Sequence, residues 1–407
     1  MRDSYIRRSL EPVIKRAVSE FPAVILTGPR QSGKTTLLQS LFHNKCGYVS
    51  LDAPDVRAAA RNDPRGFLAM YPAPVIFDEV QNAPDLLPYI REKIDARRQE
   101  KGQYLLTGSQ NLLLTEKVSE SLAGRAAVLR LLPLTRREIS GEPEKPFPWE
   151  RSPGSPGKQS PGSKNIWEGF IRGNYPELVA DPKRDASLWH ASYVQTYLER
   201  DVRTLRQVGD LTQFQNFLRA IAARSAQLVS LTDLSRDVGV ALNTAKSWLS
   251  VLEASFQVIV LRPWYANKGK RLVKTPKVYF TDVGTLCYLT GLKDPGHASS
   301  GPMGGHIMET AVVSEVYKTL AHRGEEPNLY FWRTSSGTEV DLVLEAGNHL
   351  VPVEIKLSAT PRAAFGDSIR VFRNEYPGRA LPGYVVHPGE IRLPLGPGVS
   401  ALPLEEL

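Results

Sequence analysis

The sequence is poor in cysteine and contains no long hydrophobic run. Only Cys46 and Cys287 occur among 407 residues, far apart and without a nearby histidine pair. This excludes a disulfide scaffold and gives no zinc-ligand spacing. No apolar stretch approaches the roughly 18 residues of a membrane span, and the first residues, "MRDSYIRRSLEPVIKR", lack the apolar core of a signal peptide. We therefore expect a cytoplasmic protein without a membrane partner.

Positive charge is concentrated in one part of the chain. The whole sequence has a net charge of +8, and residues 203–277 alone contain 12 Lys/Arg against 4 Asp/Glu, which is also a net +8. A basic block in an otherwise balanced chain favours a polyanionic partner such as DNA. The alternative is a solvated basic face that only improves solubility.

The segment "GPRQSGKT" fits the phosphate-binding pattern G-x-x-x-x-G-K-[ST]. It follows the apolar strand "PAVIL" and opens a helix, which is the context that this motif requires. Backbone N–H groups of such a loop bind phosphate oxygens, while the lysine neutralises the terminal phosphates and the threonine holds Mg²⁺. The predicted nucleotide-binding residues are Gly28, Pro29, Arg30, Gln31, Ser32, Gly33, Lys34, Thr35 and Thr36.

A second strand, "PVIFDEV", ends in two carboxylates. Asp78 is placed to hold the Mg²⁺ shell, and Glu79 to polarise the attacking water. The alternative is that Glu79 only caps the next helix. Since no N-K-x-D tetrad for guanine is present, we expect ATP and Mg²⁺ as cofactors and hydrolysis rather than passive binding.

Two further positions resemble functional positions of AAA+ ATPases. The strand "YLLTGSQN" ends in polar residues, and the resemblance implies that Ser109, with Thr107 as the next choice, senses the γ-phosphate. In "SLAGRAAVLRL", Arg125 resembles the arginine finger that reaches the nucleotide of a neighbouring subunit. This implies a homo-oligomer, which we expect to be a hexameric ring. The alternative for Arg125 is an ordinary salt bridge at a helix C-terminus.

The C-terminal stretch "RTSSGTEVDLVLEAGNHLVPVEIKLS" carries charged residues into strands with an apolar alternation. Asp341, Glu354 and Lys356 can project from one face of paired strands, and Glu309 on the preceding helix could join them. Carboxylate oxygens suit Mg²⁺. The stretch resembles the PD-(D/E)xK nuclease core and, in "RTSSGTEVD", archaeal Holliday-junction resolvases. Three alternatives stay open: a buried ion-pair cluster, an exposed sheet face, and a fold that binds DNA without cutting it.

The middle of the chain has the outline of a winged helix-turn-helix, with three short helices and a two-stranded ribbon. In the recognition helix "ALNTAKSWLSVLE", helical spacing directs Ala245, Trp248, Leu249 and Leu252 inward. The side chains left outward suit phosphate contacts. Together with the cations of the wing, the predicted DNA contacts are Asn243, Thr244, Lys246, Lys268, Lys270 and Arg271.

The motifs quoted above, together with "GNYPE", "YLERDV" and "KVYFTDVG", occur in order along nearly the whole chain. In this the chain resembles a prokaryotic family of AAA+-type ATPases with a C-terminal domain long described as of unknown function. It departs from the family in a Pro/Gly/Ser-rich linker. We predict an α/β protein with these parts: a P-loop AAA+-like parallel-sheet ATPase domain (1–140), the linker (141–165), a helical lid (166–207), a winged helix (208–295) and a restriction-endonuclease-like domain (304–400). In the lid, Arg172 or Arg200 could sense nucleotide.

Three functional hypotheses follow. The first is a Mg²⁺-dependent ATPase that acts on duplex or branched DNA, with junction processing as one possibility. The second is an ATP-gated, metal-dependent DNA nuclease. The third is an ATP-controlled signalling or defence switch with a protein target. Glu79 is the feature that favours turnover, and hence the first two, over the third.

Overall fold

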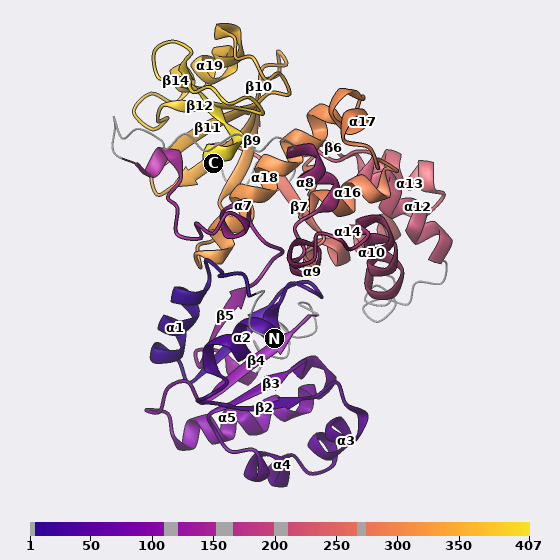
Figure 1. The fold of residues 1–407 in the computed structure, drawn as a ribbon, viewed down its shortest axis with the longest axis vertical. Helices are drawn as coiled ribbons and strands as arrows, with labels where there is room; N and C mark the ends of the chain where they lie inside the picture. The colour runs from indigo at the N-terminus through magenta and orange to yellow at the C-terminus, as the bar shows by residue number, and fades with distance from the viewer. Residues whose placement is uncertain (1–4, 110–120, 152–165, 199–210, 267–273) are drawn as a thin grey trace.

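The computed structural model describes residues 5–109, 121–151, 166–198, 211–266 and 274–407. The chain forms two lobes, one of which contains the N-terminal third, while the other contains the C-terminal sheet and the helices beside it (Figure 1). A narrow junction near α7 (Arg136–Ile139) joins the lobes. The two lobes correspond to the predicted ATPase domain and to the remaining parts taken together.

A five-stranded, all-parallel sheet forms the centre of the N-terminal lobe. Its strands lie in the order β2-β3-β4-β1-β5, so β1 is flanked by β4 and β5 rather than by the next strand in sequence. The strand bounds are β1 Ala23–Thr27, β2 Gly47–Ser50, β3 Val75–Asp78, β4 Tyr104–Gly108 and β5 Ala126–Arg130. Because all strands are parallel, their carboxyl ends meet at one edge, where α/β proteins bind ligands.

Helices cover both faces of this sheet, because successive strand residues point to opposite sides. Val24 and Leu26 pack with the apolar residues of α1 and α2, whereas Ala23 and Ile25 pack with those of α3, α4 and α5. The helix bounds are α1 Glu11–Glu20, α2 Lys34–Phe42, α3 Pro54–Asn62, α4 Pro64–Met70 and α5 Leu87–Ala96, with short 3₁₀ turns at Val80–Asn82 and Pro84–Leu86. The α/β layering predicted from the sequence is confirmed.

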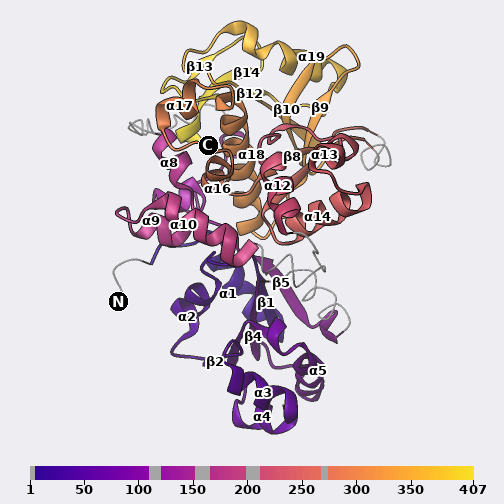
Figure 2. The same cartoon turned by 90° about the vertical axis from the view of Figure 1, so that its right-hand side faces the viewer.

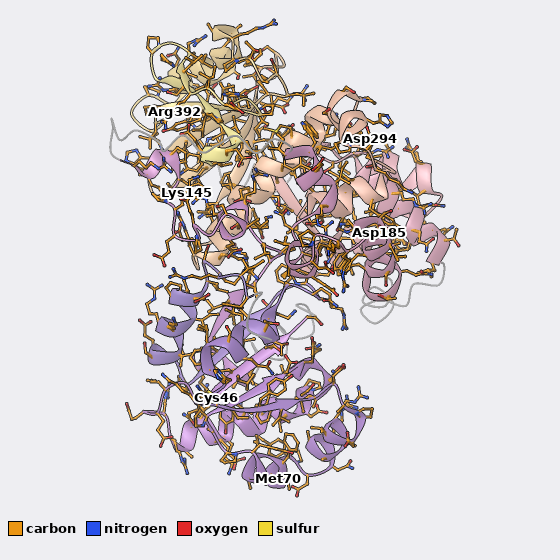
Figure 3. The ribbon with its side chains drawn as sticks, viewed as in Figure 1. Cys46, Met70, Lys145, Asp185, Asp294 and Arg392 are labelled. Atoms are coloured by element: carbon orange, nitrogen blue, oxygen red, sulfur yellow. The ribbon has the colours of Figure 1, made fainter. Side chains whose placement is uncertain are left out.

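Short helices connect the lobes and form the lid. Their bounds are α7 Arg136–Ile139, a 3₁₀ turn at Pro148–Glu150, α8 Ile166–Arg172, α9 Pro176–Ala180, α10 Ala186–Tyr193 and a π-helical turn at Val194–Leu198. Asp185 caps α10 by accepting from Leu188 N, and Asp294 caps the later helix α17 (Pro295–Ser300) by accepting from His297 N (Figure 3). Figure 2 shows α9 and α10 directly over the ATPase lobe.

The middle segment contains the elements predicted for a winged helix. The order is α12 Leu211–Ala222, β6 Gln227–Leu228, α13 Leu231–Val238, α14 Leu242–Ala254, β7 Val258–Pro263 and β8 Lys277–Phe280. Strand β8 pairs antiparallel with both β7 and β6. Ala245, Trp248, Leu249 and Leu252 of α14 are buried, so the predicted inward face is confirmed.

The C-terminal segment has the predicted order of helix, three strands and helix, and then adds three strands. Its bounds are α16 Val283–Leu289, α17, α18 Gly304–His322, β9 Leu329–Arg333, β10 Glu339–Ala346, β11 His349–Ile355, α19 Asp367–Glu375, β12 Gly383–His387, β13 Leu393–Pro394 and β14 Val399–Pro403, with 3₁₀ turns at Ala363–Gly366 and Leu404–Glu406. Antiparallel pairs join β9, β10 and β11, and parallel pairs join β11, β12 and β14.

One nine-stranded sheet runs through both the middle and the C-terminal segments, in the order β13-β14-β12-β11-β10-β9-β7-β8-β6. The link is a parallel pairing of β7 with β9, in which Arg262 lies opposite Tyr330 and Pro263 opposite Phe331. One large hydrophobic cluster includes residues from Phe147 to Leu407, and smaller clusters pack separately in the same lobe. The segments expected at 208–295 and 304–400 are therefore packed as one body.

No helix in the described part of the chain is both long and apolar enough to cross a membrane. Both cysteines are free thiols, and Cys287 is buried while Cys46 is half-buried.

Candidate active site

The phosphate-binding loop occupies the carboxyl end of β1, and its backbone uses conformations that glycine permits. Gly33 has a φ of 90° directly before α2 begins at Lys34. Gly28 has a φ of 151°, and a Cβ built there would lie 2.0 Å from Leu131 O, so no side chain fits between the loop and the strand end opposite. The loop thus presents its N–H groups and the first turn of α2 at one place.

Lys34, Thr35 and Asp78 lie together at the base of the loop. Lys34 Nζ donates to Gly28 O at 3.0 Å and to Pro29 O at 2.8 Å, across the loop. Thr35 Oγ1 donates to Asp78 Oδ1 at 2.7 Å, and Tyr48 Oη donates to Asp78 Oδ2 at 3.1 Å. A hydroxyl beside a carboxylate is the oxygen donor set that Mg²⁺ takes in nucleotide sites, so these residues fit the predicted metal role.

Glu79 has a backbone conformation that is uncommon for a residue other than glycine. Its φ of 56° and ψ of 49° place it in the left-handed region, which is costly for a residue with a side chain. Its N–H donates to Thr107 Oγ1 at 3.0 Å, and its Oε2 accepts from Ser109 Oγ at 3.1 Å and from Gln81 Nε2. Although Glu79 precedes a 3₁₀ turn, its side chain makes no capping bond there, which disfavours the structural alternative.

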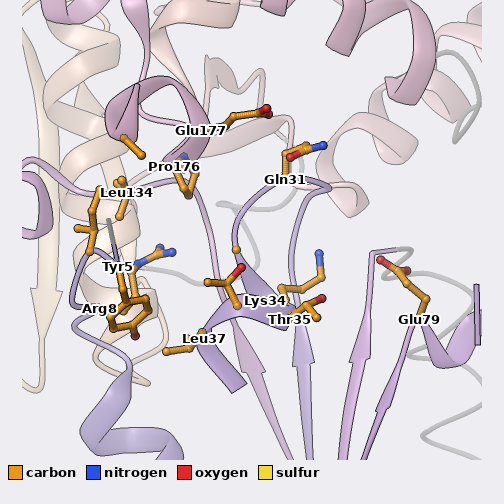
Figure 4. Close-up of a pocket in the computed structure, with 14 residues that line it drawn as sticks. Tyr5, Arg8, Gln31, Lys34, Thr35, Leu37, Glu79, Leu134, Pro176 and Glu177 are labelled. Carbon is orange, nitrogen blue, oxygen red and sulfur yellow. The ribbon is translucent and has the colours of Figure 1, made fainter. Parts of the chain in front are cut away.

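A cavity of about 440 Å³ opens beside these groups. Lys34, Thr35 and Glu79 lie on its phosphate-loop side, together with Gln31, Gly33 and Thr36, and Pro176, Glu177 and Ala180 of the lid line the other side (Figure 4). Tyr5, Ile6, Arg8, Leu37 and Leu134 complete the lining. The other predicted residues do not line this cavity: Gly28, Pro29, Ser32, Asp78 and Ser109 are buried, and Arg30 is half-buried.

The sequence motif "GNYPE" was expected in the lid without a role, and its Pro176 and Glu177 now prove to line the cavity. Glu177 is held in place because its Oε2 accepts from Trp189 Nε1 at 2.8 Å. Tyr5 and Arg8, from the N-terminal segment, were missed. No local motif marks them, because they reach the cavity only through the fold.

Arg125 lies at the opposite edge of the sheet from the phosphate-binding loop. Its carbonyl accepts from Ala23 N, at the start of β1, whereas the loop follows the end of β1. Its guanidinium forms a two-point ion pair with Asp95, with Nε–Oδ1 at 2.7 Å and an N–O distance of 3.0 Å to Oδ2. Within one chain, therefore, Arg125 has the salt-bridge role that was the structural alternative, and a role toward a neighbouring subunit stays a prediction.

Of the two lid arginines, Arg172 does not line the nucleotide cavity. Its guanidinium donates to Leu178 O at 2.9 Å, to Arg184 O at 3.1 Å and to Asp181 O, and so ties the lid loop together. These hydrogen bonds to backbone carbonyls give Arg172 a structural role that does not require nucleotide binding. Arg200 lies outside the described residues.

The structure brings the four predicted residues of the C-terminal site into one acidic cluster, defined here as Glu309, Asp341, Glu354 and Lys356 with Lys277 and Glu339. Lys356 Nζ lies 2.5 Å from Glu354 Oε1, and Ser368 Oγ donates to Glu354 Oε2 at 2.8 Å. Lys277 of β8 lies 2.9 Å from Glu309 Oε1 and also pairs with Glu339. Asp341 Oδ2 accepts from Ile355 N at 2.8 Å, across paired strands.

Carboxylates outnumber lysines in this cluster, and their pKa values reflect it. Burial, followed by the negative charge of Asp341, raises the pKa of Glu354 to about 8 and that of Glu309 to about 7. Burial works against the charge of Lys277, but Glu309, Asp341 and Glu339 outweigh this effect and raise its pKa. The cluster is thus held by two internal cations.

The predicted metal site in this cluster is not supported. Within the described residues, no group of three or more histidine, cysteine, aspartate or glutamate side chains is arranged so that it could hold a metal ion. Lys277 pairs with Glu309 and Lys356 with Glu354, as in the ion-pair alternative, and a metal role for these residues stays a prediction. Lys277 was missed because it comes from the ribbon of the middle segment, more than 30 residues before Glu309 in sequence.

The predicted DNA-binding residues are only partly described. Asn243 and Lys246 are exposed on α14, and Thr244 is half-buried between them. Lys268, Lys270 and Arg271 of the wing lie outside the described residues. The outward face of α14 is therefore polar and accessible, as expected.

The parallel sheet, the phosphate-binding loop and the acidic strand end define a P-loop ATPase of the AAA type, and a family model described as "AAA domain" matches residues 20–140. Two models described as domains of unknown function match residues 163–296 (DUF8612) and 304–407 (DUF4143). The chain is 33% identical over 408 residues to the uncharacterized proteins Rv2008c of Mycobacterium tuberculosis and Mb2031c of Mycobacterium bovis, covering 98% of this chain and 84% of theirs. The chain belongs to the family that these proteins represent.

Among solved structures, the Walker-type ATPase PABY2304 of Pyrococcus abyssi is similar with a TM-score of 0.48 and 15% identity, covering 71% of this chain and 97% of that one. A single-residue variant of RuvB from Thermotoga maritima is similar with a TM-score of 0.29 and 14% identity, covering 61% and 88%. The family assignment rests on the full-length relatives.

Proposed function

We propose that this protein is a Mg²⁺-dependent ATP hydrolase whose turnover acts on DNA. The observation that carries the hydrolytic part is the convergence of Lys34, Thr35 and Glu79 on one cavity, with Asp78 2.7 Å behind Thr35. Lys34 binds the terminal phosphates, and Glu79 accepts a proton from the attacking water. Bound Mg²⁺ would supply charge neutralisation on the phosphates, with Thr35 and Asp78 as the groups that hold it.

The hydrogen bonds around the Glu79 carboxylate support its role as the general base. Ser109 Oγ and Gln81 Nε2 donate to the same oxygen, Oε2, and fix the direction of the carboxylate. Its other oxygen, Oε1, is then the one available to orient a water molecule. Thr107 of the adjacent strand β4 donates to Asp78 Oδ1 and accepts from the N–H of Glu79, and so fixes the two acids at the end of β3.

DNA as the target is supported by the charge distribution and by α14. The basic segment 203–277 carries the whole net charge, and α14 within it presents the exposed residues Asn243 and Lys246. Polar and cationic side chains on an accessible helix suit phosphate contacts. We propose in addition that the protein works as a homo-oligomer, in which Arg125 serves the neighbouring subunit.

The test is the steady-state ATPase rate with no DNA, single-stranded DNA, duplex DNA and a four-way junction. We expect stimulation by at least one DNA form, and near-complete loss of turnover in Glu79→Gln under every condition. Lys246→Ala should weaken DNA binding and reduce its salt dependence, whereas Lys93→Ala, an exposed lysine of α5 in the ATPase lobe, should not. Turnover that ignores all DNA forms would reject the DNA target and leave the hydrolase intact.

A further inference from the structure

A buried series of polar contacts begins at the phosphate-binding loop with Arg8. This side chain is 3% exposed and lines the nucleotide cavity. One terminal nitrogen donates to Ser32 O of the loop at 2.9 Å, and the other donates to Leu132 O at 2.6 Å. Its Nε lies 3.2 Å from Glu138 Oε2. One guanidinium thus holds the loop, the segment after β5 and a buried carboxylate in fixed relation.

Glu138 is the next residue in the series and is 1% exposed. Its carboxylate accepts from Ser9 N at 2.8 Å and from Thr135 N at 2.9 Å. Burial alone would raise the pKa of Glu138, but Arg8, His322 and the hydrogen bond from Thr135 N together outweigh it and hold that pKa well below its usual range. Because a buried charge without a partner is costly, Arg8 and Glu138 depend on one another.

His322, the last residue of α18, completes the series. Its Nδ1 lies 3.0 Å from Glu138 Oε1, and its Nε2 accepts from Leu132 N at 3.0 Å. Burial lowers the pKa of His322, so the ring is neutral at pH 7. Since Leu132 N–H can only donate, Nε2 is the acceptor, and Nδ1–H donates to Glu138.

Helix α18 holds the same connecting segment at two further points. Lys318 Nζ donates to Leu134 O at 2.9 Å, and Glu315 accepts from Arg136 N at 2.9 and 3.0 Å. On the other side, Leu131 N donates to Thr27 O at 2.8 Å, where the loop begins. Residues 131–138 are therefore clamped between the nucleotide site and α18, which runs from the junction of the lobes into the C-terminal lobe (Figure 1).

We propose that Arg8 is a positioning residue for the phosphate-binding loop, and that the Arg8–Glu138–His322 series transmits the nucleotide state of the loop to α18. This rests on the ATP-binding role proposed above. A helix of 19 residues moves as one piece, and its other end carries Glu309 of the acidic cluster and Thr310, which bonds Ser225 of the middle segment at 3.0 Å. Nucleotide binding is thereby coupled to the nine-stranded sheet.

The experiment is amide hydrogen exchange of α18 in the full-length chain, with and without ATP and Mg²⁺, in a Glu79→Gln background that prevents turnover. ATP should change exchange in α18. His322→Leu, which can neither donate nor accept, should abolish that change, and His322→Gln, which can do both, should restore it. Arg323→Lys is the matched control, because Arg323 follows His322 and pairs with Glu150 instead, and it should keep the response.

Arg8→Lys provides a second test of the coupling, and this test does not depend on the stability of the histidine variants. Lysine keeps the charge but cannot contact Ser32, Leu132 and Glu138 together. With Glu79 intact, we expect KM for ATP to rise about tenfold, as for the loss of a charged hydrogen bond, while kcat changes less than about twofold. The coupling would be overturned if the ATP-dependent change in α18 exchange persists in both Arg8→Lys and His322→Leu. It would also be overturned if the Glu79→Gln chain binds ATP normally but shows no change in α18 exchange. Failure to bind ATP at all would instead overturn the proposed function.

Discussion

Carboxylates gather at two places in this molecule, and their partners differ. At the phosphate-binding loop, Asp78 and Glu79 accept hydrogen bonds from hydroxyl and amide groups, all of them neutral, and Glu79 borders a cavity. In the acidic cluster, Glu309 and Glu354 are paired with Lys277 and Lys356. Carboxylates with neutral partners keep a negative charge that an external cation can bind. Carboxylates paired with internal lysines already have a cation beside them. The same residue types can therefore build a ligand site or a closed structural cluster.

The largest effect that tests this comparison should come from Asp78→Asn. The amide keeps the shape but removes the negative charge beside Thr35, so Mg²⁺ is held poorly. We expect kcat/KM for ATP to fall by about 10³-fold, within the range for loss of one transition-state electrostatic contact. Raising the Mg²⁺ concentration should recover part of this loss in an ATPase assay. Glu79→Gln is the matched variant, because it should lose turnover while keeping Mg²⁺-dependent ATP binding.

Arg125→Ala should have an effect of at least similar size if the residue serves a neighbouring subunit. An arginine that stabilises the charge of phosphoryl transfer contributes on the order of 10³-fold or more, and its loss in an oligomer should lower kcat accordingly. Asp95→Asn is the control, because it breaks the same exposed ion pair without removing the guanidinium. Equal ATPase rates for Arg125→Ala and the parent chain would show that the salt bridge is its whole role.

Lys277→Met should destabilise the C-terminal lobe without affecting nucleotide binding. The lysine side chain is 5% exposed and pairs with Glu309 and Glu339, so its loss would leave Glu309 without its cation and Glu339 with Arg333 alone. Breaking a buried pair in this way costs about 3 kcal/mol or more, measurable by urea unfolding. KM for ATP should stay unchanged. Divalent-cation binding by the variant, monitored with Mn²⁺, would further show whether the lysine excludes a metal.

The smallest effect concerns pH and Glu354. Its folded-state pKa of about 8 lies above the usual value of 4.5. Between these two pH values, Glu354 is therefore protonated in the folded protein and ionised in the unfolded chain. The resulting stability is fully present below pH 4.5 and is lost as the pH rises through 8. Glu354→Gln should flatten this decline by a few kcal/mol at most, since one pKa unit corresponds to about 1.4 kcal/mol. Thermal unfolding between about pH 5 and pH 8.5 is the measurement, and an unchanged slope would contradict the expected linkage.

The sequence predicted best those features that depend on neighbouring residues. The strand before Gly28, the loop itself and Asp78 at a strand end are local patterns, and all were located correctly. The inward face of α14 followed from helical spacing in the same way. Such patterns need no knowledge of the rest of the fold, because strand and helix periodicity decide them.

Contacts between distant segments could not be predicted. Arg8 reaches Ser32, Leu132 and Glu138 only because the N-terminal segment folds over the loop. Lys277 enters the acidic cluster only because β8 belongs to the same sheet as β10. A lysine in a predicted basic ribbon gives no sign that it will be buried. For this reason the sequence identified Lys356 as a cation beside the C-terminal carboxylates but did not identify Lys277.

The parallel pairing of β7 with β9 has a practical consequence for dissecting the protein. A fragment beginning at residue 304 would have an unpaired β9 edge, and exposed sheet edges promote aggregation. It would also lack Lys277 and Tyr279, which would leave Glu309 without these two partners and Glu339 with Arg333 alone. Although family models divide the chain between residues 296 and 304, a cut there would split one sheet. A C-terminal piece that keeps the sheet whole must begin before β6. A cut near residue 141 would still remove the residues 132–138 that Glu315, Lys318 and His322 of α18 contact, and would leave these buried side chains without those partners.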